Sequence, residues 1–135
     1  MLNTVKKNTF RKQEKICSQK QIDKLFAQRK SITAGPFRMI FLESEGSSLP
    51  AVQVLIAIPK KNIKLAVNRN RMKRLVREAY RMNKHTILEL YESIGKHCDI
   101  AFVFTGRKCI SQPETIAAIN ELLSRLKVTY EKRSE

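Results

Sequence analysis

The stretch from Ala66 to Arg81 most constrains how this chain can fold, because it combines dense positive charge with regularly spaced apolar residues. The apolar residues in it are Val67, Met72, Leu75, Val76, Ala79 and Tyr80. Their spacing predicts an amphipathic helix that buries one face in a core. A second set at steps of three and four falls on another side and comprises Asn70, Lys73, Arg74, Arg77, Arg81 and Lys84. We therefore expect a folded helix that presents a row of cations, and not a disordered basic tail.

Length and composition indicate a single domain over residues 1–135 that binds an anionic partner. Hydrophobic residues make up 42% of the 135 residues, which is enough for a packed core at this length. The formal net charge is +15, whereas solubility alone requires roughly 2 to 8 charges in a small domain. A domain with this much self-repulsion favours nucleic acid as its partner. No apolar run reaches the about 18 residues that would cross a membrane, so we expect no membrane partner.

The residue types that catalyse hydrolysis or hold metals are too scattered to predict an active site in the protein. Cys17, Cys98 and Cys109 form no CxxC pair, which indicates reduced thiols in the cytoplasm and no zinc site. His85 and His97 match no metal-ligand spacing, and we expect each at the surface or at a helix end. No glycine-rich phosphate loop and no recognisable pair of carboxylates occur. We therefore predict no catalytic residue, no metal site and no cofactor bound by the protein itself.

The first half of the chain predicts a helix followed by two strands. A basic arm covers about residues 1–17. The segment Ser18–Gln21 fits a capping box and opens a helix near 19–29. Strands follow over 37–42 and over 51–58, where apolar residues alternate along the chain. Because a short turn-rich loop joins these two strands, we expect them to pair as an antiparallel hairpin.

The second half predicts a helix, a strand and a final helix. The basic helix begins at about Asn68, which can cap it, and its apolar face continues to a stop at Gly95. A strand covers 99–105, and a capping box at 111–114 opens the last helix. The end at 129–135 is expected to fray. Together the elements predict an α/β (α+β) two-layer sandwich, in which helices pack on a small mixed sheet of about four strands.

The region around the basic helix resembles the signature of the bacterial ribonuclease P protein subunit. The matching residues are Pro59-Lys-Lys61 and Ala66-Val-x-Arg-Asn-Arg-x-Lys-Arg-x-x-Arg-Glu-x-x-Arg81, with the triplet Arg69–Arg71 at the centre. The order of elements, the basic arm and the strands near Phe37 and Ile100 also fall where that family has them. The resemblance implies a left-handed crossover around the basic helix, although such connections are normally right-handed.

The resemblance also implies a function. The chain would be the non-catalytic protein subunit of a ribonucleoprotein endonuclease, inactive alone and located in the cytoplasm, with no obligate protein partner. One partner would be the catalytic RNA, which uses magnesium ions to remove the 5′ leader from precursor tRNA. The precursor tRNA itself would be the second partner. The RNA-binding residues implied are Lys60, Lys61, Arg69, Asn70, Arg71, Lys73, Arg74, Arg77 and Arg81. The leader would lie between the first helix and the sheet, against Phe26, Phe37 and Ile40.

The residues alone also allow interpretations without a specific function in tRNA processing. Phe26, Phe37 and Ile40 also suit plain core positions, as large apolar residues usually do. A general structural RNA-binding protein of ribosome type, with no role in cleavage, would carry the same charge. Stimulated cleavage of precursor tRNA by the catalytic RNA at low magnesium would separate the two functions.

Overall fold

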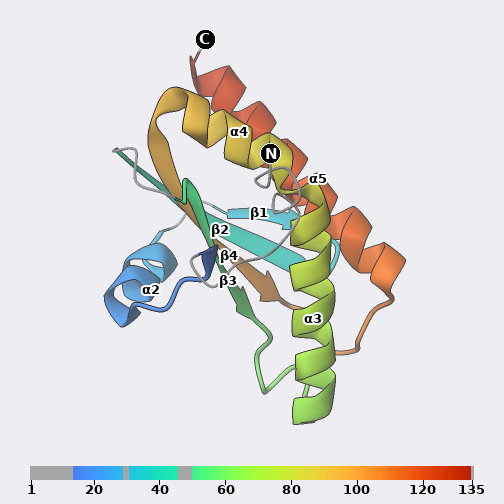
Figure 1. Ribbon diagram of the computed structural model, residues 1–135. Coiled ribbons are helices and arrows are strands. Elements are labelled where there is room, and N and C mark those ends of the chain that lie inside the picture. The colour runs from blue at the N-terminus through green and yellow to red at the C-terminus, as the bar shows by residue number, and fades with distance from the viewer. Residues whose placement is uncertain (1–13, 29–30, 46–49, 135) are drawn as a thin grey trace, which may run out of the picture.

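The computed structural model describes residues 14–28, 31–45 and 50–134 and shows helices packed on a four-stranded sheet (Figure 1). The elements in chain order are α2 (Gln19–Phe26), β1 (Ser31–Ala34), β2 (Phe37–Glu45), β3 (Val52–Ala57), α3 (Ala66–Asn83), α4 (His85–Ile94), β4 (Lys96–Phe104) and α5 (Gln112–Ser134). Helices α3, α4 and α5 cover one face of the sheet, and the short α2 lies on the other. The expected α+β class with a mixed sheet is confirmed.

The strand order is β1-β2-β4-β3, so the expected hairpin between the second and third strands is wrong. β4 lies between β2 and β3, antiparallel to the first and parallel to the second. The physical reason is that β4 is apolar on both faces, with Ile100, Ala101 and Phe102 all buried. Such a strand belongs in the interior of a sheet.

The strand β1 was not predicted, because its four residues are too few to show a pattern. Only Ala34 in it is buried. A tight turn at Gly35, whose φ is +55°, joins it to β2. At the opposite edge of the sheet, Lys15 bridges Val54 of β3 in parallel. The segment from Glu14 to Ile16 is therefore docked on the sheet, which corrects its assignment to an extended arm, whereas residues 1–13 lie outside the described residues.

The helix α3 buries the predicted face, with three corrections. Met72, Val76, Ala79 and Tyr80 are buried in the main core, but Leu75 is only half-buried and Val67 is 71% exposed. The helix begins at Ala66, one turn earlier than expected, with Leu65 and not Asn68 at the N-cap. Leu65 contributes no side-chain cap, so the local capping signal did not mark this start.

The apolar face expected to continue to Gly95 is divided between two helices. α3 ends at Asn83, and α4 follows it at an angle (Figure 1). Lys84 stands at the break and is 2% exposed, in an ion pair with Glu14. It therefore does not belong to the exposed row of cations. The predicted stop is confirmed, since Gly95 caps α4 in the left-handed conformation with φ of +66°.

The remaining boundaries differ by a few residues from those expected. α2 ends at Phe26, and the Ser18 side chain caps it by accepting from the Gln21 backbone N–H. The capping box at the start of α5 is confirmed in both directions between Ser111 and Glu114. α5 extends to Ser134, so the chain is helical through most of the stretch that we expected to fray. β3 joins the parallel β4 through α3 and α4, and the left-handed sense of this crossover stays a prediction.

Candidate nucleic-acid interface

The predicted RNA-binding residues, all cations except Asn70, lie along the open side of α3 and on the connection before it. Asn70, Arg71 and Arg74 are exposed on α3, as are Lys60 and Lys61 on the connection. The half-exposed members of the set are Arg69, Lys73, Arg77 and Arg81. One turn of an α-helix rises about 5.4 Å, so side chains at steps of three and four form a continuous charged row. An extended polyanion can contact several of them at once.

Two members of this row already have protein partners. The Arg69 guanidinium donates to the backbone carbonyls of Ile63 at 3.0 Å and Lys64 at 2.7 Å. Arg81 forms a two-pronged ion pair with Glu78. The hydrogen bond from Arg81 lowers the pKa of the Glu78 carboxyl below its usual value. Arg69 therefore holds the connection in place, and the charge of Arg81 is partly balanced before any RNA binds.

Replacing Arg69 with Ala should mainly lower the stability of the fold, whereas replacing Arg74 with Ala should mainly weaken RNA binding. Arg69→Ala removes two hydrogen bonds to the connection and should lower the free energy of unfolding by about 1 to 2 kcal/mol. Arg74→Ala should change that free energy by less than about 0.5 kcal/mol, yet weaken RNA binding by about 1 to 3 kcal/mol. Urea denaturation and RNA titration measure the two quantities. Equal stability of the two variants would contradict the structural role of Arg69.

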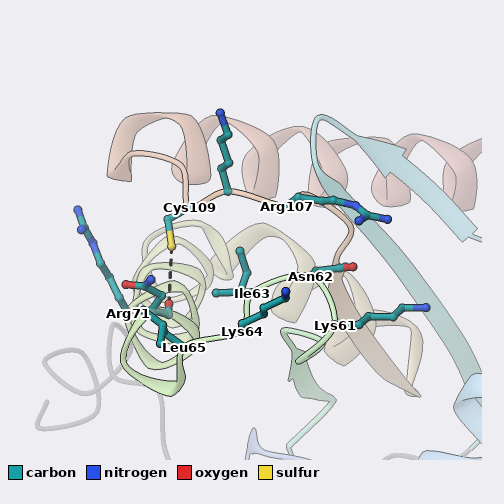
Figure 2. Close-up of a pocket in the computed structure, with 10 residues that line it drawn as sticks. Lys61, Asn62, Ile63, Lys64, Leu65, Arg71, Arg107 and Cys109 are labelled. Carbon is teal, nitrogen blue, oxygen red and sulfur yellow. Dashed lines mark hydrogen bonds between the residues drawn. The ribbon is translucent and has the colours of Figure 1, made fainter.

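A basic pocket of about 560 Å³ opens beside the start of α3 (Figure 2). Its lining comes from the connection, from the first turns of α3 and from the turn between β4 and α5, and comprises Lys61, Asn62, Ile63, Lys64, Leu65, Asn68, Arg71, Arg107, Lys108 and Cys109. Five of these residues are cations. Lys61 and Arg107 extend to one side of the pocket, and Arg71 extends to the other (Figure 2). Positive charge therefore surrounds the opening from several directions.

Two local features bring the distant turn to this pocket. The Asn62 amide donates to the Phe104 carbonyl at 3.1 Å, which joins the connection to the end of β4. At Gly106, an added Cβ would come within 2.8 Å of the Phe104 ring and 3.1 Å of Pro36. Glycine at this position therefore lets the chain pass close to the Phe104 ring and Pro36, where a larger residue would have to displace them. Sequence reasoning missed Lys64, Arg107 and Lys108; the signal for Lys64 was the basic connection before α3, and that for Arg107 and Lys108 was the basic turn after Gly106.

The three residues expected to line a common leader cleft do not share one surface. Phe37 is fully buried in the main core, with its ring centroid 5.2 Å from that of Phe104. Ile40 is buried on the opposite face of β2, beneath α2 with Leu25. Phe26 is 42% exposed on α2. Because alternate residues of a strand point to opposite faces, Phe37 cannot accompany Ile40, so the expectation is wrong for Phe37.

Other side chains accompany Ile40 on the α2 face of the sheet. In register beside it, Arg38 of β2 pairs with Val103 of β4, which pairs with Ala57 of β3. Arg38 is exposed, whereas Val103, Ala57 and Leu55 are half-buried. This face therefore offers half-buried apolar surface beside the exposed cation Arg38, in a place where an unpaired base and its phosphate could lie.

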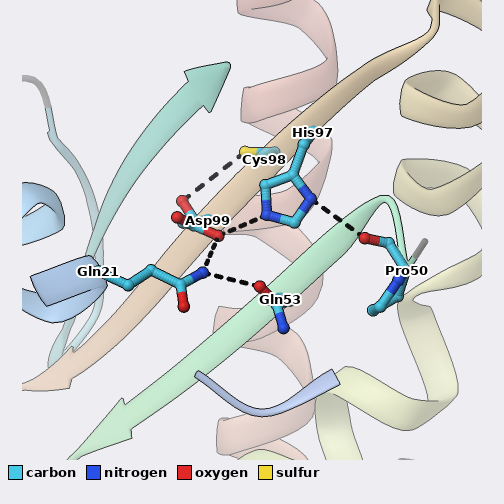
Figure 3. Close-up of polar contacts among 6 residues, drawn as sticks. All are labelled: Gln21, Pro50, Gln53, His97, Cys98 and Asp99. Carbon is cyan, nitrogen blue, oxygen red and sulfur yellow. Dashed lines mark hydrogen bonds and ion pairs between the residues drawn. The ribbon is translucent and has the colours of Figure 1, made fainter. Parts of the chain in front are cut away.

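The titratable residues do not assemble into a reaction centre in the part of the chain that the structure describes. No group of three His, Cys, Asp or Glu side chains suited to a metal ion occurs there. His97 is not at the surface or at a helix end as expected, but lies on β4 with both ring nitrogens engaged (Figure 3). The three cysteines are free thiols. No helix among the described residues has the length and apolar character to cross a membrane.

Comparison with known proteins gives a consistent result. The protein-family model described as Ribonuclease P matches residues 10–127. The ribonuclease P protein component of Chlorobium phaeobacteroides is 40% identical over 108 residues, which cover 73% of each chain. That of Porphyromonas gingivalis is 33% identical over 92 residues, covering 68% of this chain and 67% of the relative.

Solved structures share the fold. The RNase P protein of Staphylococcus aureus superposes with a TM-score of 0.66 at 20% identity, covering 85% of this chain and 96% of the other. The RNase P protein from Thermotoga maritima gives a TM-score of 0.61 at 22% identity, covering 83% and 96%. These two likenesses concern the arrangement of helices and strands.

Proposed function

Because this chain belongs to the ribonuclease P protein family and is a protein component of that tRNA-processing enzyme, we propose that α3 and the basic pocket bind the catalytic RNA. The observation that carries the proposal is the location of the cations. Exposed Arg71 and Arg74 and half-exposed Arg and Lys side chains line α3, and five cations line the pocket at its start. Arg binds phosphate oxygens in a bidentate fork, so this surface suits the backbone of a folded RNA.

The second part of the proposal concerns the substrate. We place the 5′ leader of precursor tRNA against the α2 face of the sheet, beside Arg38, Val103 and Phe26. The leader is single-stranded, and such strands are held by a combination of cations and apolar or aromatic side chains. Magnesium ions would enter with the catalytic RNA, and the cell compartment would be the cytoplasm, consistent with three free thiols. Family membership favours this function over a general RNA-binding protein of ribosome type.

A cleavage assay with purified components tests the proposal. Protein alone should release no leader from precursor tRNA, because its described residues contain no catalytic cluster. At low magnesium, adding the protein to the catalytic RNA should raise the cleavage rate, since the protein's cations offset phosphate repulsion that magnesium otherwise screens. Arg71→Ala combined with Arg74→Ala should lose this stimulation, whereas Lys127→Ala on α5 serves as the matched control. Binding without stimulation would favour the ribosome-type alternative.

A further inference from the structure

A polar cluster lies beneath α2, on the sheet face opposite the main core (Figure 3). The Gln21 side-chain amide donates to the Asp99 carboxylate at 2.9 Å and to the Gln53 side-chain oxygen at 2.7 Å. His97 Nε2 lies 2.7 Å from the same Asp99 oxygen, and its Nδ1 lies 3.1 Å from the Pro50 carbonyl. The cluster therefore joins α2 to β3, to β4 and to Pro50, which lies two residues before β3.

The cluster matters because α2 has little else to hold it. The helix has eight residues, of which only Leu25 is buried. The half-buried Ile22 packs against the same apolar cluster as Leu25, whereas Phe26 is 42% exposed. Both hydrogens of the Gln21 amide are used, one toward β4 and one toward β3. The angle of α2 over the sheet is thus set by the apolar side chains Leu25 and Ile22 together with the polar side chain Gln21.

The geometry also favours one charge state of His97, the imidazolium. Both of its partners, the Pro50 carbonyl and the Asp99 carboxylate, can only accept hydrogen bonds. A neutral imidazole carries one N–H, so it would leave one nitrogen lone pair facing an acceptor. The imidazolium form donates to both and balances the carboxylate, whose residue is 8% exposed. A buried carboxylate without such a partner is costly, so Asp99, His97 and Gln21 support one another.

Among the described residues, no other charged side chain on the neighbouring elements faces the His97 imidazole. On β2, Leu42 pairs with Asp99 and Ser44 with His97, and both are uncharged. Glu43 and Glu45 alternate to the opposite face, where Glu43 accepts from Tyr91 and Glu45 pairs with Lys96. From β3 and α2, the contacts come from the neutral Gln53 and Gln21. Asp99 is therefore the charged group that His97 meets.

We propose that Gln21, Asp99 and His97 are positioning residues, which hold α2 at the angle over the sheet that leader binding requires and which do so fully when His97 is protonated. This inference rests on the proposed placement of the leader beside α2. It adds that leader affinity depends on side chains that do not touch the RNA.

The direction of the pH dependence follows from the interactions of His97. The hydrogen bond to Asp99 raises the pKa of His97 above its usual value, although burial opposes the shift. A group with a raised pKa in the folded state contributes its full stabilisation below the unfolded value of about 6.5. That contribution is lost as the pH rises through the raised pKa. The hold on α2 should therefore weaken from neutral to mildly alkaline pH.

The test uses the reconstituted enzyme, with the catalytic RNA and two substrates that differ only in the leader. The affinity gained from the leader is the ratio of the Kd for leaderless tRNA to the Kd for precursor tRNA. Gln21→Ala should reduce this gain by up to about tenfold, since it removes a hydrogen bond to a charged group. Binding of leaderless tRNA should be unchanged. Gln19→Ala is the matched control, because the Gln19 amide bonds to the exposed Asp23 within α2.

His97→Gln gives an independent readout. In the native enzyme the affinity gained from the leader should fall as the pH rises through the pKa of His97, and in His97→Gln it should be independent of pH. Native-state hydrogen exchange should show faster exchange of α2 amides in Gln21→Ala than in Gln19→Ala. An equal gain in both Gln variants, with no pH dependence in the native enzyme, would overturn the positioning role. If the native enzyme gains no affinity from the leader at all, the proposed leader contact itself fails.

Discussion

Replacing Lys84 with Met should lower the free energy of unfolding by about 3 to 5 kcal/mol, because it removes the positive charge that balances the buried Glu14 carboxylate. Lys84 Nζ lies 2.8 Å from Glu14 Oε1, and the two side chains are 3% and 8% exposed. This pair joins the docked segment before α2 to the break between α3 and α4. Urea denaturation followed by circular dichroism would measure the loss.

Two further variants separate two contributions to this loss of stability: the buried charge left unbalanced and the changed packing of the side chain. Glu14→Gln combined with Lys84→Met removes both charges and should recover a large part of the lost stability, since replacing both partners of a buried pair costs far less than removing one. Lys108→Met makes the same chemical change at an exposed position and should be close to neutral. If Lys84→Met proved as stable as Lys108→Met, the ion pair would contribute nothing to the fold.

Raising the salt concentration from 50 to 200 mM should weaken binding to the catalytic RNA by roughly 300- to 1000-fold, if about six phosphates are neutralised. Counterion release then gives a slope of about −4 to −5 in a plot of log affinity against log salt concentration. Lys64→Ala combined with Lys108→Ala should flatten this slope by about one to two units, because both lysines belong to the basic pocket. Titrations at four or more salt concentrations would measure it.

The same titration on Lys127→Ala provides the control, because this lysine of α5 lies outside the pocket lining. Its slope should match that of the native protein. A slope that the double pocket variant leaves unchanged would show that the pocket is not part of the RNA footprint, and that the exposed row on α3 carries the electrostatic contribution alone.

Features that depend on neighbouring residues could be predicted from the sequence. The facing of α3 followed from its periodicity, and Met72, Val76 and Tyr80 are buried as expected. The N-cap at Ser18 and the capping box at Ser111 were recognised because the capped residues lie three positions away, although the Gln21 side chain bonds to Gln53 and Asp99 and does not complete a capping box. In each case the physical cause is contained in one or two helical turns, so the pattern is visible without knowledge of the fold.

Features that depend on distant residues could not be predicted in this way. The insertion of β4 into the sheet depends on pairings with β2 and β3 that no local pattern specifies. Lys84 has the spacing of an exposed cation, and its burial results from Glu14, which is 70 residues away in the chain. The pocket likewise depends on Arg107 and Lys61, which are far apart in the chain and line the same space. Even Arg69, five or six residues from its partners, has a structural role that charge alone did not indicate.

The position of β4 also determines when this protein can fold during synthesis. β1 and β2 are joined by a tight turn and can pair as soon as they are made. Among the described residues, β3 pairs in the sheet with β4 and otherwise has only the isolated bridge to Lys15, so most of its pairing waits until Lys96–Phe104 has left the ribosome. Non-local pairing of this kind slows folding and leaves strand edges open to other chains in the meantime. A nascent chain that stalls before β4 would therefore expose two apolar strand edges, and it is at this stage that the protein is most prone to aggregate.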